Sequence, residues 1–224
     1  MSTICGRIGP AFPRLGQLVY AASRAWYRAK YARNHLYDPD SPFALERIES
    51  MRNRISRGEE VYLAGLGVAG HNSGAALLKV SAHDGILLLS NDEEERFSAV
   101  KHHATYPTQS LDCLTQRLAG LGLTPRDLHA VLLSWNYASI TSLGYRTVAE
   151  HFPASLKLAR DGANTGWDFY RNGKLARQSP ARLAEQFGLE RPQPLIGMPH
   201  HENHAAFSYA VSPFNRSDEP VMIT

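Results

Sequence analysis

Three histidines stand within five residues in the stretch Pro199-His-His-Glu-Asn-His-Ala-Ala206, and imidazole is the commonest metal-binding side chain. The stretch follows a short apolar run and is expected to begin a helix. His200 and His204 are four residues apart, so on a helix they share one face and can direct ring nitrogens at one ion. The alternative is a helix start with solvated histidines. We favour a metal site, whose third ligand, a carboxylate, must come from elsewhere.

A glycine-rich loop, Gly65-Leu-Gly-Val-Ala-Gly-His-Asn-Ser-Gly74, is a second candidate. Its glycines would let backbone amides approach an anion closely. Asn72 and Ser73 can add hydrogen bonds, and His71 can serve as donor or base. A glycine-rich hairpin with polar tips would show the same pattern. The loop is neither a Walker loop, because no Gly-Lys-Ser/Thr follows, nor a dinucleotide-binding fingerprint, because a strand follows it.

Side chains of both charges fill the segment from Asn91 to His103, which includes Arg96 and Lys101. Such a segment can contact a charged substrate. It can also be a solvated loop whose surface ion pairs contribute little to stability. The charge pattern alone favours the solvated loop.

These segments are expected to be positioned by a mixed α/β sheet. Three short strands, Val61–Gly67, Ala75–Val80 and Ile86–Ser90, are joined by tight connections and predict an antiparallel meander. Helices and further strands then alternate, a pattern closer to one lobe of an actin-like ATPase than to a doubly wound dinucleotide fold. These later elements are a helix that begins at about Thr108 and ends near Gly120–Gly122, with Leu111, Leu114, Leu118 and Leu121 on one face, strands at 130–135, 195–198 and 221–224, and a helix at 200–210.

Residues 1–59 are expected to form a basic, helical N-terminal extension. The first 37 residues carry six basic side chains and no acidic one, whereas the remainder carries 18 basic and 21 acidic side chains. We therefore expect no nucleic-acid partner for the main body. A helix over 14–34 has an apolar face that suits a membrane surface, a partner, or packing on the main body. We favour packing. That face consists of Leu15, Leu18, Val19, Ala22 and Trp26.

The cysteine content and hydropathy point to the cytoplasm. Two cysteines in 224 residues give no disulfide framework. No apolar run approaches the roughly 20 residues of a membrane-spanning helix, so we expect no transmembrane segment.

The three segments, taken in order, resemble the motifs of the ATP-dependent O-carbamoyltransferases. That family includes nodulation-factor and antibiotic carbamoyltransferases and is related to tRNA threonylcarbamoyl-transfer proteins. Its Gly-His-Asp-x-x-Ala-Ala-Leu-Leu motif reads Gly70-His-Asn-Ser-Gly-Ala-Ala-Leu-Leu78 here, and its Glu-Glu-Arg-Phe-Ser-x-x-Lys-His motif reads Glu94 to His102. Its His-His-x-x-His-Ala-Ala motif reads His200 to Ala206. Asn72 replaces the usual aspartate and removes a negative charge.

The resemblance implies that residues 60–224 are the first lobe of an actin-like, acetate-kinase-like (ASKHA) ATPase fold. The implied reaction moves a carbamoyl group from carbamoyl phosphate, through a carbamoyl adenylate made with ATP, to the hydroxyl of a small-molecule acceptor. By motif position, His71 and Lys101 are the catalytic candidates. Gly70, Asn72, Ser73 and Arg96 are the candidates for substrate or phosphate binding, and His200 and His204 would hold a divalent metal ion, iron by analogy with relatives.

In relatives the strand matching Val221–Thr224 runs into an Asp-Gly-x-Gly-Glu loop with an active-site aspartate, followed by a second lobe. We therefore expect these 224 residues alone to be inactive and to need a C-terminal half or a partner chain. One alternative is a non-catalytic metal- or partner-binding remnant of the family. A weaker one is a sugar-kinase or chaperone-type ATPase lobe, which the histidine pair disfavours because phosphoryl transfer in that fold uses carboxylates and magnesium.

Overall fold

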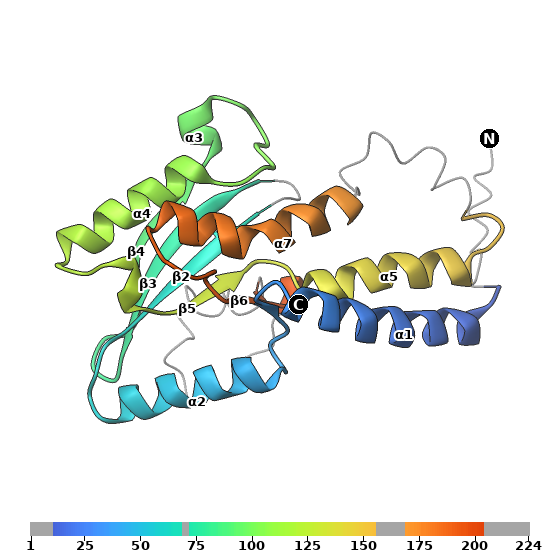
Figure 1. The fold of residues 1–224 in the computed structure, drawn as a ribbon, viewed down its shortest axis with the longest axis horizontal. Helices are drawn as coiled ribbons and strands as arrows, with labels where there is room; N and C mark the ends of the chain where they lie inside the picture. Colours follow the sequence, from blue (N-terminus) through green and yellow to red (C-terminus); the bar gives the residue numbers. More distant parts are fainter. Residues whose placement is uncertain (1–10, 69–71, 156–168, 204–224) are drawn as a thin grey trace, which may run out of the picture.

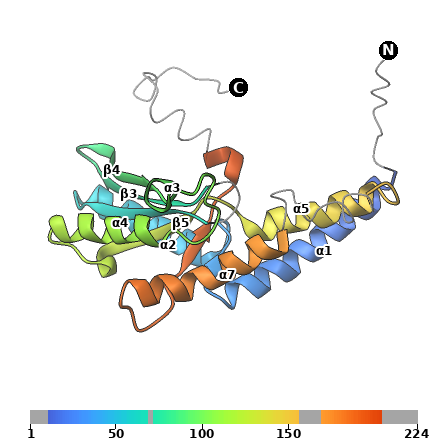
Figure 2. The same cartoon turned by 90° about the horizontal axis from the view of Figure 1, so that it is seen from above.

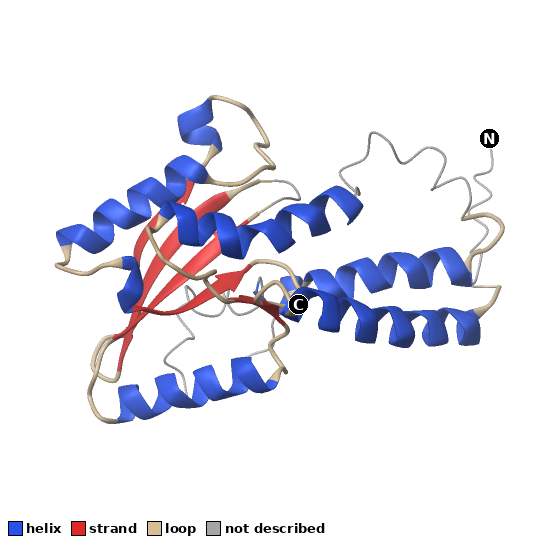
Figure 3. Ribbon diagram, in the orientation of Figure 1, coloured by secondary structure: helices blue, strands red, loops and turns tan. Residues whose placement is uncertain are grey.

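The computed structural model describes residues 11–68, 72–155 and 169–203 of the chain. These residues form an α/β fold around a six-stranded mixed sheet with the strand order β1-β6-β5-β2-β3-β4 (Figures 1 and 3). The strands are β1 (Leu36–Tyr37), β2 (Val61–Gly67), β3 (Gly74–Ser81), β4 (Gly85–Glu93), β5 (Leu128–Leu133) and β6 (Leu195–Gly197). The helices are α1 (Pro13–Ala32), α2 (Pro42–Ser56), α3 (Glu95–Ser98), α4 (Thr108–Gly120), α5 (Tyr137–Glu150) and α7 (Phe169–Gln186), with a 3-10 turn at Pro125–Asp127.

The predicted antiparallel meander is confirmed: β2 pairs with β3, and β3 with β4. The turn between β3 and β4 places Gly85 at φ +71°, a left-handed conformation that glycine adopts without steric cost. Strand β4 extends three residues beyond the predicted end, because pairing continues until Glu93 lies opposite Gly74. A β-bulge shifts the register between Leu77 and Leu78.

Parallel strands complete the sheet on the other side of β2. Strand β5 is parallel to β2, and β6 is parallel to β5. The edge strand β1 pairs in parallel with β6, with Leu36 opposite Leu195. We did not predict β1, because a two-residue strand has no periodicity to detect. It draws part of the expected N-terminal extension into the sheet.

The sheet carries a helical layer on each face (Figures 1 and 2). Successive strand residues point to opposite faces, so Leu195 packs in the larger core while Ile196 packs in the smaller one. The larger core combines the sheet with α4 and α7; the smaller core lies under α2 and includes Ala44. Three of the leucines predicted on one face of α4, namely Leu111, Leu114 and Leu118, are buried, but Leu121 is exposed because the helix has ended at Gly120.

Helices α1 and α5 lie side by side and extend away from the sheet (Figure 2). They are antiparallel: the Phe12 N–H donates to the Glu150 carbonyl at 3.1 Å, while Tyr31 and Thr141 meet near the sheet. Helix α1 therefore packs on the main body, as we favoured. It does so through a different stripe from the predicted one, and Leu15, Leu18 and Trp26 of that predicted stripe are exposed.

Two sequence-based expectations fall outside the described residues. The helix predicted at 200–210 begins at His200 and is described through Asn203 only. The strand predicted at 221–224 is not among the described residues. In the parts of the chain that are described, no helix is both long enough and apolar enough to cross a membrane.

Candidate functional site

Five of the described strands have their carboxyl ends at one edge of the sheet, and the predicted site segments follow three of them. Strands β2, β5 and β6 are parallel, and β4 runs in the same direction because two antiparallel steps separate it from β2. Loops beyond the carboxyl ends of strands are the usual ligand-binding place in open α/β sheets. The glycine-rich loop follows β2, the charged loop follows β4, and His200 follows β6.

The glycine-rich loop and the charged loop are in direct contact. The backbone N–H and the hydroxyl of Ser73 both donate to the His103 carbonyl, each at 2.8 Å. The Asn72 amide oxygen lies 3.1 Å from Nδ1 of His102, which donates to it. Two segments about 30 residues apart in the chain thus form one surface. Gly70 and His71, also predicted in this site, lie outside the described residues.

Glu94, near the start of the charged loop, binds the first turn of helix α4. Its side chain is 2% exposed. One carboxylate oxygen accepts the Gln109 N–H at 3.0 Å, and the other accepts the N–H and hydroxyl of Ser110 at 2.8 and 2.9 Å. The N-cap residue of α4 is Pro107, whose side chain makes no capping bond. The first N–H groups of a helix need acceptors, and the missing side-chain cap is the sequence signal that could have assigned this role to Glu94.

The charged loop then turns back through two left-handed residues. Ala99 has φ +55° and His102 has φ +56°, conformations that cost free energy for residues with a side chain. Glu95 stabilises the second of them by accepting the His102 N–H at 3.0 Å. Arg96 and Lys101 lie on this loop with exposed side chains. Arg96 lies 4.0 Å from Glu93, at the limit of an ion pair.

His200 is held against the end of β5. Its ring stacks on Trp135, with centroids 3.6 Å apart and planes 5° from parallel. Its Nδ1 lies 3.4 Å from the Ser134 carbonyl oxygen, which also accepts Nδ2 of Asn203 at 3.2 Å. A carbonyl can only accept, so Nδ1 is the donor in this contact. In metal-binding histidines the ring nitrogen that points away from the metal usually donates to a carbonyl or carboxylate in the same way.

The predicted metal site is described in part. His200 fits the role through its Nδ1 contact and fixed ring, while His204 lies outside the described residues. Within residues 11–68, 72–155 and 169–203, no three His, Cys, Asp or Glu side chains gather closely enough to hold a metal ion.

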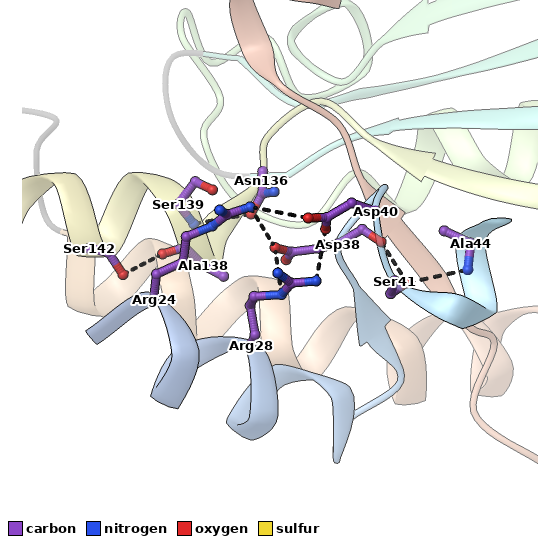
Figure 4. A network of polar contacts seen from close by, with 10 residues as sticks. All are labelled: Arg24, Arg28, Asp38, Asp40, Ser41, Ala44, Asn136, Ala138, Ser139 and Ser142. Carbon is purple, nitrogen blue, oxygen red and sulfur yellow. Dashed lines mark hydrogen bonds and ion pairs between the residues drawn. The ribbon is translucent and has the colours of Figure 1, made fainter. Parts of the chain in front are cut away.

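A buried polar network from the N-terminal segment supports this edge of the sheet (Figure 4). Asn136, directly after Trp135, caps α5 by accepting the Ser139 N–H at 3.1 Å, and its side chain lies beside the Asp38 carboxylate. Burial raises the pKa of the Asp38 carboxyl, although the guanidinium groups of Arg28 and Arg24 oppose the rise. Sequence reasoning missed this network, because nothing in the spacing links Asp38 to a residue about 100 positions away.

These two arginines bind both carboxylates of the turn after β1. Arg28 lies 3.2 Å from Asp38 and 2.9 Å from Asp40, and Arg24 lies 3.4 and 3.7 Å from the same two residues. Helix α1 is thereby tied to β1 and, through Asn136, to the strand end that carries Trp135.

Comparison with known proteins adds sequence similarity without an assigned activity. No family model matches the chain. A curated relative, an uncharacterized protein of Synechocystis sp. (strain ATCC 27184 / PCC 6803 / Kazusa), is 29% identical over 160 residues. The aligned part is 70% of this chain and 24% of the relative, so the chain spans about a quarter of the relative's length.

Proposed function

We propose that the chain is the first lobe of an actin-like ASKHA carbamoyltransferase. The observation that supports this most is that the three motif-bearing segments follow strands that end at one edge of the sheet. Two of these segments are in contact there, through Asn72 and Ser73 with His102 and His103, while the His200 ring packs on Trp135. If the three motifs were unrelated coincidences, nothing would require them to follow strands that end at the same edge.

The topology supports the finer fold assignment. An actin-like lobe is expected to open with a meander and to continue with helix-connected strands. Here β2, β3 and β4 form the meander, and β5 and β6 add in parallel beside β2. Helix α4 connects the meander to β5, and α5 and α7 connect β5 to β6.

Carbamoyl transfer to a hydroxyl requires removal of the hydroxyl proton and stabilisation of a developing oxyanion. In this proposal His71 takes the proton, and Lys101 with Arg96 supplies positive charge. Gly70, Asn72 and Ser73 would bind the carbamoyl adenylate that derives from carbamoyl phosphate and ATP. Asn72 would act through its amide, whose oxygen already contacts His102.

His200 and His204 would hold the divalent metal ion, expected to be iron. Bound there, the ion would act as a Lewis acid toward the carbamoyl oxygen. The protein's own contribution is to fix the His200 ring through Trp135 and the Ser134 carbonyl. The acceptor is expected to be a small molecule with a hydroxyl group.

Thermal-shift titrations of the purified chain test the proposal. The probes are Co²⁺ and 5′-O-(N-carbamoylsulfamoyl)adenosine, a stable mimic of carbamoyl adenylate, with AMP as the control nucleotide. We expect Co²⁺ to raise the melting temperature, the mimic to raise it further, and AMP to have a smaller effect. His200→Ala should abolish the Co²⁺ shift, whereas His83→Ala, at an almost fully exposed side chain, should keep it.

Two results would count against the proposal. If Co²⁺ raises the melting temperature of His200→Ala as much as that of the unaltered chain, His200 does not hold the metal ion. Metal binding with no preference for the mimic over AMP would favour the alternative of a non-catalytic metal-binding protein.

A further inference from the structure

Helix α1 has two different apolar stripes, and only one of them is packed. The packed stripe faces α5 and includes Gly16, which is buried, and Tyr27, whose ring stacks on Tyr145 at 6.1 Å. The other, here called the outer stripe, consists of Leu15, Leu18, Ala22, Trp26 and Ala29, which fall on one helix face at 3.6 residues per turn.

The outer stripe is open to solvent. Leu15, Leu18 and Trp26 keep 50%, 69% and 55% of their surface exposed. Large apolar side chains clustered on one exposed face indicate an interaction surface more than a chance arrangement. The stripe does not belong to the candidate site, whose residues follow the strand ends of the sheet.

The charges around the outer stripe are of one sign. Helix α1 contains four basic residues and no acidic one. Two of these, Arg24 and Arg28, are neutralised by Asp38 and Asp40. The remaining cations of this region lie beside the stripe or at its end: Arg14 and Arg33 are exposed, and Lys30 lies 4.4 Å above the Trp26 ring.

We propose that the outer stripe of α1 binds the surface of an anionic lipid bilayer. A helix with Leu and Trp on one face and flanking Lys and Arg is suited to lie in the bilayer interface, where the apolar side chains enter the acyl boundary and the cations meet lipid phosphates. Trp prefers this interface because its ring is amphipathic.

Charge argues against two other occupants. A second copy of the chain would bring Arg14, Lys30 and Arg33 of one molecule close to the same cations of the other. A nucleic acid would satisfy the cations, but it would leave Leu15 and Leu18 without an apolar partner, because nucleic-acid interfaces are polar. An anionic lipid surface offers an apolar environment to Leu15 and Leu18 and negative charge to the flanking cations.

Vesicle co-sedimentation of the full chain tests the proposal. The probes are vesicles of phosphatidylcholine alone and of phosphatidylcholine mixed with phosphatidylglycerol. We expect binding to the anionic vesicles to be about ten-fold tighter than to the neutral ones. Raising the salt concentration from about 0.1 to about 1 M shortens the Debye length from about 10 to about 3 Å and should remove most of that difference.

Leu18→Glu places a charge in the stripe at a site where the side chain is exposed, so the fold should be kept, and binding to anionic vesicles should fall at least about ten-fold. Leu121→Glu is the matched control, because Leu121 is 51% exposed and lies at the end of α4, outside the outer stripe. Binding that does not depend on anionic lipid, or that both variants reduce equally, would overturn the proposal. Light scattering that shows a dimer which Leu18→Glu dissociates would identify a second copy as the occupant.

Discussion

Glu94 offers the sharpest test of how the candidate site is held. Its carboxylate accepts three hydrogen bonds from Gln109 and Ser110 at the start of α4, and it is almost completely buried. Loss of an N-cap costs about 0.5–2 kcal/mol. Hydrogen bonds to a charged acceptor contribute about 1.5–3 kcal/mol each, and their contributions do not add fully.

We therefore expect Glu94→Ala to lower the free energy of unfolding by about 3 kcal/mol. Glu94→Gln should cost about 2 kcal/mol, because one amide oxygen remains while its NH₂ group faces the N–H donors of α4. For a chain of this size, 3 kcal/mol corresponds to a melting temperature lower by roughly 6–12 °C. Urea titration followed by circular dichroism measures both variants.

Glu93→Gln is the matched control, since Glu93 is half-exposed and its contact with Arg96 is 4.0 Å long. It should change stability by less than about 0.5 kcal/mol. The reasoning fails if Glu94→Ala stays within about 1 kcal/mol of the unaltered chain. It also fails if Glu93→Gln and Glu94→Gln destabilise the protein equally.

Three other changes test the elements around the site. Burial raises the pKa of the Asp38 carboxyl in the folded protein, so the contribution of Asp38 to the free energy of unfolding should fall as pH rises from about 4 through that pKa. Urea midpoints measured between about pH 4 and 7 should show this decrease for the unaltered chain, and Asp38→Asn should remove it. Gly16→Ala should destabilise the protein by about 1–3 kcal/mol, because the new Cβ would lie 2.0 Å from Cγ of Glu150. Its control, Gly120→Ala, has open space around the new Cβ and should be neutral or stabilise by up to about 1 kcal/mol. Thermal denaturation compares the two variants. Trp135→Ala should weaken Co²⁺ binding in calorimetry about ten-fold by releasing the His200 ring, and an unchanged affinity would show that the stack does not position the ligand.

The elements that the sequence predicts well are those with periodicity. Helix α4 and the strands of the meander lie within three residues of the predicted bounds, since their apolar spacing is regular. The convergence of the site segments could also be anticipated in outline, because strand direction decides which loops share an edge. The contact between Asn72 and His102 could not, as it depends on two left-handed residues in the charged loop.

The prediction for α1 shows why an apolar stripe does not identify its own partner. Periodicity marks Leu15, Leu18 and Trp26 as one face, yet the face that packs on α5 contains Gly16, Tyr27 and Tyr31. Gly16 permits a close approach to Glu150 that a side chain would prevent. The interface depends on close packing at a small residue and on hydroxyl contacts of Tyr27 with Tyr145 and of Tyr31 with Thr141. A hydrophobicity pattern in the sequence records neither of these features.

Opposite faces of helix α1 therefore have different roles. Its inner face carries Arg24 and Arg28, which hold Asp38 beside Asn136 and so support the strand end that bears Trp135. Its outer stripe is the surface proposed to meet lipid. Because the same rigid helix connects the two, a bilayer bound at Leu18 would fix the orientation of the sheet edge that carries His200. If this coupling is real, anionic vesicles should change the Co²⁺ affinity of the unaltered chain and leave that of Leu18→Glu unchanged. An identical affinity with and without vesicles would show that the two faces act independently.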